Sequence, residues 1–287
     1  MNVKEFKVNR NGKLSQIFLR QNPEISFNLF QKILRTKDVK LNGVRVSKDV
    51  SVKVGDVVCF YYKNDAVSNS VEVVYQDDNL LVVFKRRNIE TVTETGDCLL
   101  ARVNAQLGFE CFAVHRLDRN TEGLVVFAKN QESKQQLDEA LKKRTIEKFY
   151  LALVYGLIPD KEKNMIAYLK KHAEKSFVEI SDKKTEGFEK IQTNYKVVGE
   201  FENSTLVEVE LVTGKTHQIR AHFSHIGHFV VGDEKYGDSK VNKLFGRKNQ
   251  CLCAYKIKFH FKEGALSYLD GKEIVLDKSK IDFCQNL

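Results

Sequence analysis

The chain has 287 residues, of which 42% are hydrophobic, so it is long enough to bury a core and to form two domains. It contains no run of about 18 apolar residues, and its first ten residues lead into no apolar segment. We therefore expect neither a membrane span nor an export signal, and a cytoplasmic location. The six cysteines form no C-x-x-C pair, which argues against a disulfide framework and a zinc ribbon.

Positive charge is concentrated near the N-terminus. Residues 1–63 hold 13 of the 47 lysines and arginines but 5 of the 38 acidic residues, and so carry +8 of the formal net charge of +9. Such a segment is typical either of a polyanion-binding surface or of a solvated face that only aids solubility.

The first segment reads as a small module of two helices and a hairpin. Residues 13–34 have apolar side chains at helical spacing, with a break at Asn22–Pro23. Asn42–Gly43 lies between two β-branched stretches within 39–46, which predicts a tight hairpin, and 57–61 predicts a further strand. The basic residues expected to follow a phosphate backbone are Arg35, Lys37, Lys40 and Arg45.

Residues 11–62 resemble the S4 RNA-binding module. The resemblance lies mainly in LNGVRV (41–46) followed by VKVGDVV (52–58). The usual Arg-Leu-Asp opening of the first helix is replaced here by Lys13-Leu14-Ser15.

Residues 63–70 are polar and turn-prone, so we expect a linker there and a second domain over 71–287. Runs of short strands with few helices indicate the α+β class. The expected strands are 71–74, 80–84, 123–128, 149–154, 195–198 and 206–211, and the expected helices are 131–144 and 216–226.

The segment 115–123, HRLDRNTEG, places two carboxylates and several cations in a loop just before an apolar strand. Loops at strand ends often carry active sites. On composition alone, a surface salt-bridge cluster is the simpler interpretation.

Three stretches change that interpretation, because they resemble the motifs of the RluA-like pseudouridine synthases in the family's order. They are HRLDRNTEGLVVFAK (115–129), KFYLALVYG (148–156) and TGKTHQIRAHFSHIGHFVVGDEKYG (213–237). With LCAYKIKF (252–259), the similarity covers about 71–262. It implies a mixed, largely antiparallel β-sheet with flanking helices and a central cleft. It also implies isomerisation of uridine in structured RNA by base flipping, with no metal or other cofactor.

The resemblance assigns roles to individual residues. Asp118 stands at the catalytic position, where an ionised carboxylate can attack base or sugar or stabilise a cleaved intermediate. Arg220 is its charge partner, Tyr150 stacks on the target base and could help to remove the C5 proton, and Arg116 fills the space that the flipped nucleotide leaves. Further substrate-binding residues are expected at His115, Thr121, Lys148, Lys215, His217 and Gln218.

The chain departs from the family pattern at three places. Glu122 replaces a usual serine, Lys215 replaces an arginine, and Lys85-Arg86-Arg87-Asn88 stands where Lys-Pro-Ala-Gly is common. None of these changes removes a catalytic group, but all could alter contacts with RNA.

Rival interpretations carry less weight. Thr213-Gly214-Lys215-Thr216 lacks the first glycine of a P-loop, since that position is Val209. Gly227 interrupts the spacing of His222, His225 and His228, which argues against a metal site. Asp118 with Glu122 is a weak version of a glycosidase pair.

An S4 module joined to this catalytic domain resembles the branch that acts on large-subunit ribosomal RNA. A synthase specific for transfer RNA and a catalytically silent RNA-binding protein stay open as alternatives. We expect a monomer by default.

Overall fold

The computed structural model describes residues 2–22, 27–62, 71–94, 96–172 and 177–285. They form two compact units. One comprises the chain up to Val71 together with 92–110, and the other comprises 72–91 and 111–287. The expected linker, 63–70, lies outside the described residues, as does Pro23 of the expected break between helices, so the domain boundary at 63–70 stays a prediction.

The N-terminal unit packs two helices on an antiparallel four-stranded sheet of order β1-β6-β3-β4. The ring of Phe18 lies at its centre, with centroids 4.7 Å from Phe30 and 4.4 Å from Phe60. The predicted helices and the hairpin at Asn42–Gly43 are confirmed. The elements are β1 (Asn2–Lys7), β2 (Gly12–Lys13), α1 (Leu14–Gln21), α2 (Phe27–Arg35), β3 (Val39–Leu41), β4 (Val44–Val46), β5 (Ser51–Val52), β6 (Val57–Tyr62) and α3 (Leu99–Leu107).

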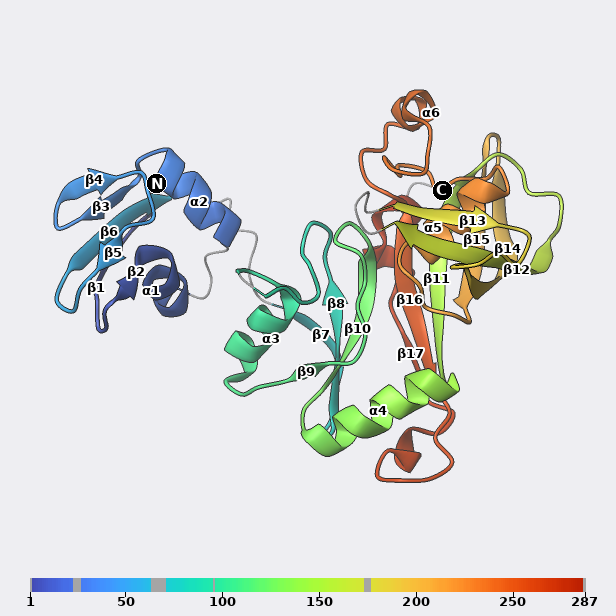
Figure 1. Ribbon diagram of the computed structural model, residues 1–287, viewed down its shortest axis with the longest axis horizontal. Coiled ribbons are helices and arrows are strands. Elements are labelled where there is room, and N and C mark those ends of the chain that lie inside the picture. The colour runs from blue at the N-terminus through green and yellow to red at the C-terminus, as the bar shows by residue number, and fades with distance from the viewer. Residues whose placement is uncertain (1, 23–26, 63–70, 95, 173–176, 286–287) are drawn as a thin grey trace. The chain divides into compact units, whose positions relative to one another are not determined.

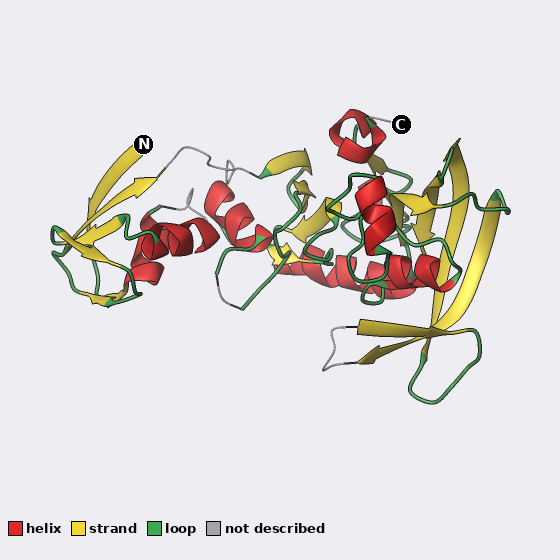
Figure 2. Ribbon diagram, turned by 90° about the horizontal axis from the view of Figure 1, so that it is seen from above, coloured by secondary structure: helices red, strands yellow, loops and turns green. Residues whose placement is uncertain are grey.

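The second unit is built on an 11-stranded sheet of order β13-β12-β14-β15-β11-β16-β10-β8-β7, with β17 on β16 and β9 on β10 (Figures 1 and 2). Among the described residues, all its strand pairs are antiparallel except β10 with β16, as predicted. The strands are β7 (Glu72–Gln76), β8 (Leu80–Lys85), β9 (Phe112–Ala113), β10 (Glu122–Ala128), β11 (Ile146–Tyr155), β12 (Glu162–His172), β13 (Phe177–Ser181), β14 (Glu189–Phe201), β15 (Ser204–Leu211), β16 (Leu252–Phe259) and β17 (Glu273–Val275).

Three helices of this unit bear on the site. The first, α4 (Gln131–Lys143), buries Leu137 and Ala140 against the main core, and Asn130 caps its start by accepting a hydrogen bond from the Ser133 amide at 2.8 Å. The second, α5 (Gln218–His225), packs on β13 and β14. The third, α6 (Ser239–Leu244), is short, and its N-cap is Asp238.

The parallel contact between β10 and β16 positions the loop that precedes β10. Gly123 has φ 128°, and a Cβ atom there would lie 2.2 Å from the Ala254 carbonyl oxygen, so only glycine fits. Ala254 in turn pairs with Tyr150 of β11. This close approach brings residues 115–121 and the middle of β11 to the same part of the sheet.

The six cysteines are free, and four of them are buried. Among the described helices, none has the length and apolar content needed to cross a membrane.

Candidate active site

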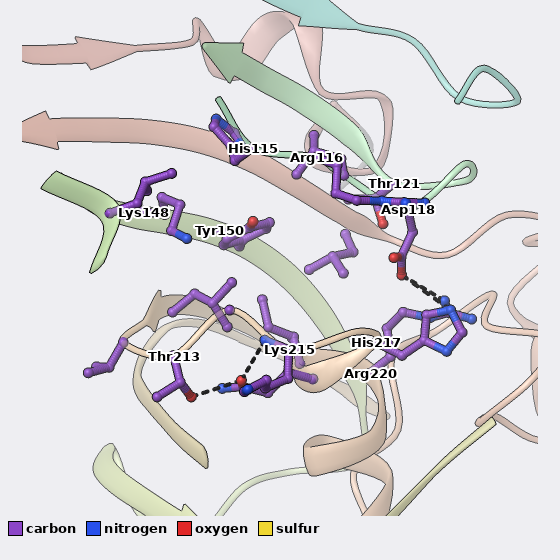
Figure 3. A pocket seen from close by; sticks show the side chains of 18 of the residues that line it. His115, Arg116, Asp118, Thr121, Lys148, Tyr150, Thr213, Lys215, His217 and Arg220 are labelled. Atoms are coloured by element: carbon purple, nitrogen blue, oxygen red, sulfur yellow. Dashed lines mark hydrogen bonds and ion pairs between the residues drawn. The ribbon is translucent and has the colours of Figure 1, made fainter. Parts of the chain in front are cut away.

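A cavity of about 610 Å³ opens in the second unit between the loop before β10, strand β11, the segment after β15 and helix α5. Figure 3 shows Tyr150 in the middle, with Lys148 on one side and Asp118 on the other. The cavity lining includes all the residues of this unit that the sequence predicted to act on substrate. They are His115, Arg116, Asp118, Thr121, Lys148, Tyr150, Lys215, His217, Gln218 and Arg220.

One end of the cavity is a buried chain of charges. Arg220 donates from Nη1 to Asp118 Oδ2 at 2.9 Å, and from Nε and Nη2 to the two carboxylate oxygens of Asp233 at 2.6 and 3.0 Å. The Asp233 side chain is fully buried, whereas that of Asp118 is 26% exposed. Of these two carboxylates, that of Asp118 is therefore the one that a ligand in the cavity can reach.

Hydrogen bonds and neighbouring charges stabilise the ionised forms of Asp233 and Arg220. Burial alone would raise the pKa of Asp233, but hydrogen bonds and the charge of Arg220 hold it below its ordinary value. The Lys235 and Tyr236 amides also donate to Asp233 Oδ1, at 2.9 and 3.1 Å. The two carboxylates outweigh burial at Arg220 and raise the pKa of its guanidinium.

His217 lies beside this chain of charges in one tautomer. Its Nε2 is 3.8 Å from Asp118 Oδ2, and its Nδ1 is 2.9 Å from the Tyr236 hydroxyl. That hydroxyl also accepts a hydrogen bond from the Val178 amide at 3.0 Å, and it donates to Nδ1 when the ring carries its proton on Nε2, the nitrogen that faces the accepting carboxylate of Asp118. Burial lowers the pKa of His217, and a neutral ring then carries its proton on Nε2, facing Asp118.

Two further features support this position. The backbone of His217 has φ 53°, a left-handed conformation that costs about 1–2 kcal/mol and that the surrounding contacts must maintain. The Tyr236 ring also lies 5.2 Å from the Arg220 guanidinium. Tyr236 thus positions both neighbours of Asp118.

The opposite side of the cavity carries positive charge without partners. The Lys148 amine forms no ion pair with any described residue, and burial lowers its pKa. Lys142 and Arg144 are exposed at the rim, as is Arg116, which lies nearer to Asp118 (Figure 3). These cations suit the phosphates of a polyanion.

Tyr150 separates the two sides. Burial, and next the charge of Asp118, raise the pKa of its hydroxyl well above the ordinary value. His115 lies on the Lys148 side, where its Nε2 accepts a hydrogen bond from the Val126 amide at 3.1 Å. Burial lowers the pKa of His115 to about 3, so its ring is neutral.

Buried polar contacts hold the loop that carries Asp118. The Lys85 amine donates to the carbonyls of Arg86, Ile89 and Arg119 at 3.0, 2.8 and 3.0 Å. Thr91 Oγ1 bonds to both the amide and the carbonyl of Leu117, at 3.1 and 3.2 Å. The loop is therefore fixed before any ligand arrives.

Two predicted substrate-binding residues have their polar groups engaged within the protein. Thr121 Oγ1 accepts a hydrogen bond from the side-chain Nε2 of Gln250. Gln218 Oε1 accepts from Thr213 Oγ1 and from the Lys215 amide, while its Nε2 donates to Gln192 O and Thr193 Oγ1. These contacts shape the cavity wall. A direct contact between Gln218 and substrate would require one of its bonds to break.

Lys215, the residue in place of the usual arginine, forms an ion pair with Glu189. Two other departures from the family pattern, Arg87 and Glu122, form an ion pair with each other. Arg87 bonds to Glu122 at 2.6 Å and to both carboxylate oxygens of Asp282 at 2.6 and 2.7 Å. Glu122 is thus directed toward Arg87 and does not line the cavity.

The four basic residues predicted to bind RNA lie in the N-terminal unit. Arg35 and Lys37 are exposed. Arg45 donates to the Lys37 carbonyl at 2.8 Å, and the Lys40 amine lies 5.5 Å from the centre of the Tyr61 ring. Both side chains therefore also stabilise the hairpin.

The sequence interpretation missed Asp233, Tyr236, Lys85 and Thr91. The first two lie inside the third motif, 213–237, where a buried arginine with one known carboxylate could have suggested a second. Thr91 lies in a stretch with no motif, so nothing in the sequence indicated its contact with Leu117.

Comparisons with known proteins point to one family. A family model described as RNA pseudouridylate synthase matches residues 79–225. A Mycoplasma capricolum protein named "Uncharacterized RNA pseudouridine synthase" is 31% identical over 298 aligned positions, covering 94% of this chain and 96% of the relative. "Ribosomal large subunit pseudouridine synthase C" of Haemophilus influenzae is 31% identical and covers 83% and 80%. The solved structure "Human RNA Pseudouridylate Synthase Domain Containing 1" has the same fold, with a TM-score of 0.62 at 22% identity over 75% of this chain and 88% of that one.

Proposed function

This chain belongs to the RNA pseudouridylate synthase family, and we propose that it isomerises uridine to pseudouridine in large-subunit ribosomal RNA. The choice of RNA is supported by relatives named ribosomal large subunit pseudouridine synthase C. The observation that carries the proposed chemistry is the partly exposed Asp118 carboxylate, paired with Arg220 inside the cavity.

The reaction breaks the bond from N1 of uracil to C1′ and forms one from C5 to C1′. One proton leaves C5 and N1 gains one, so nothing is oxidised or reduced. Asp118 can attack the base or sugar or stabilise the cleaved intermediate, and each of these roles requires an ionised carboxylate. Arg220 places a positively charged hydrogen-bond donor on this carboxylate, and Asp233 fixes the orientation of Arg220.

Tyr150 is proposed to stack on the uracil ring. Its raised pKa keeps the hydroxyl protonated at neutral pH, so it offers a ring face and a hydrogen-bond donor rather than a phenolate base. Stacking on an aromatic ring contributes about 1–3 kcal/mol per base. That gain offsets part of the few kcal/mol needed to flip the nucleotide out of its stack.

Arg116 is proposed to occupy the space that the flipped nucleotide leaves. It is exposed at the cavity rim, two residues before Asp118. Its position supports a role beside the target nucleotide and not on the reacting atoms.

The N-terminal unit is proposed to act as an S4-like RNA-binding module. Two helices, the hairpin and a formal charge of +8 over residues 1–63 support this assignment. We also keep as predictions that the protein is cytoplasmic and monomeric, which cell fractionation and sedimentation velocity would test.

The function is tested by incubating the protein with transcripts of large-subunit ribosomal RNA and of transfer RNA, followed by mapping of pseudouridine. The expected product is pseudouridine at defined uridines of the ribosomal RNA. Product in transfer RNA alone would contradict the substrate assignment. Product in neither RNA would contradict the proposed activity.

A further inference from the structure

The exposed surface around α6 lies beyond Asp233, at the end of the chain of charges. It takes no part in the chemistry proposed above. Its aromatic part is ordered: the Tyr155 ring stacks on Phe229 with centroids 5.0 Å apart and an angle of 14°, and meets the Phe245 ring edge-on at 6.5 Å. Beside these rings, Leu244 is 86% exposed. We call this the α6 surface, comprising Tyr155, Phe229, Lys240, Lys243, Leu244, Phe245, Arg247 and Lys248.

The α6 surface is also where the second unit concentrates positive charge. Residues 238–248 contain four lysines and arginines and one aspartate, a formal charge of +3. The whole stretch 64–287 carries +1, because residues 1–63 hold +8 of the total of +9. Figure 1 shows α6 on a segment that projects from the sheet of its unit.

A buried asparagine connects this surface to the catalytic end of the cavity. Asn242 of α6 accepts from the Gly232 amide at 2.7 Å and donates to the Asp233 carbonyl at 3.0 Å. Asp233 in turn binds Arg220, the partner of Asp118. The α6 surface therefore has a fixed position relative to the reacting carboxylate.

We propose that the α6 surface binds the RNA strand that flanks the target nucleotide, an inference that rests on the proposed function. Lysines and arginines next to partly exposed aromatic rings, here Tyr155, Phe229 and Phe245, are the combination that binds unpaired nucleic acid, with cations on phosphates and rings on bases. Exposed leucines also insert against unstacked bases in nucleic-acid complexes. A protein partner is less favoured because lysine is depleted at protein interfaces.

The test measures binding of the full chain to a large-subunit ribosomal RNA transcript over a range of salt concentrations. In the double variant Lys240→Gln/Lys243→Gln, the plot of log K against log salt should become shallower by about 1.4–1.8, or about 0.7–0.9 for each lost phosphate contact. Leu244→Ala, which alters an exposed side chain, should weaken binding by about 5-fold with an unchanged slope. The matched control is Lys183→Gln/Lys184→Gln, the same charge change at two exposed lysines that do not line the cavity.

A slope in the α6 double variant equal to that of the control, with unchanged affinity of Leu244→Ala, would overturn the proposal and leave the surface for a protein partner. Pseudouridine formation by the unaltered chain on the same RNA tests the proposed function separately. If transfer RNA is the RNA that is modified, the same variants are compared on that transcript. If neither RNA is bound, both proposals fail.

Discussion

The two sides of the cavity are built on different principles. On one side, Arg220 pairs with both Asp118 and Asp233. His217, beside Asp118, is hydrogen-bonded to Tyr236. Lys148 and Arg116, in contrast, form no ion pair with a described residue. The difference indicates that the protein fixes Asp118, whose charge the proposed reaction needs, and leaves Lys148 and Arg116 to contact the substrate.

The largest effect is expected from breaking the paired side. Arg220→Met should lower the single-turnover rate by about 10²–10³-fold, because Asp118 loses the donor that stabilises its charge. Arg220→Lys keeps the positive charge but cannot bridge two carboxylates. Its rate should therefore lie between those of the unaltered protein and of Arg220→Met. A folded Arg220→Met protein with a rate near the original would contradict the role of this pair.

The second effect concerns stability and its dependence on pH. Asp233→Asn should lower the free energy of unfolding by about 3–5 kcal/mol at pH 7, because it breaks a buried ion pair. The folded pKa of Asp233 is lowered, so its contribution is complete above the unfolded value of about 3.9 and is lost as pH falls through the folded value. Urea unfolding at pH 7 and pH 3 should show the difference between the variant and the unaltered protein shrinking. A difference independent of pH would contradict this.

A change on the unpaired side should affect binding and not chemistry. Lys148→Met keeps most of the apolar stem but removes the charge. It should raise KM by about 10-fold, the loss expected for one charge-assisted hydrogen bond, while kcat stays nearly constant. Steady-state kinetics on RNA check this, with Lys163→Met, an exposed lysine outside this cavity, as the control. A fall in kcat at constant KM would move Lys148 into the chemistry.

The smallest effect is expected from the tautomer of His217. Tyr236→Phe keeps the ring against Arg220 but removes the hydroxyl that donates to His217 Nδ1. One lost hydrogen bond should reduce kcat by about 2- to 10-fold with little change in KM. Nitrogen-15 NMR of the ring should show the proton on Nε2 in the original protein, and both tautomers in the variant. A proton on Nδ1 in the original protein would refute the assignment.

The sequence predicted most of the second unit, because apolar strands such as 80–84 and 123–128 are buried on both faces and have continuous apolar runs. It missed β12 and β13, whose alternating side chains are largely polar on an open face, and the expected strands also left out β9, β16 and β17. It also missed α3, although Cys98 and Gly108 mark its ends. In that case the signal was present in the sequence.

Only those parts of the site that lie within the sequence motifs could be predicted. They identified Asp118, Tyr150 and Arg220, but pairing of Arg220 with two carboxylates depends on side-chain geometry that no spacing reveals. The contact of Arg87 with Asp282 joins positions 195 residues apart. A single sequence carries no sign of such a pairing, so Glu122 and Arg87 looked like separate departures.

The most direct test of the account replaces Asp118 with asparagine, which keeps the shape of the side chain and removes its charge. Single-turnover isomerisation is measured at saturating RNA, with RNA affinity and urea unfolding measured in parallel. We expect no detectable pseudouridine, with affinity and stability close to those of the unaltered protein. Appreciable turnover by Asp118→Asn would contradict it.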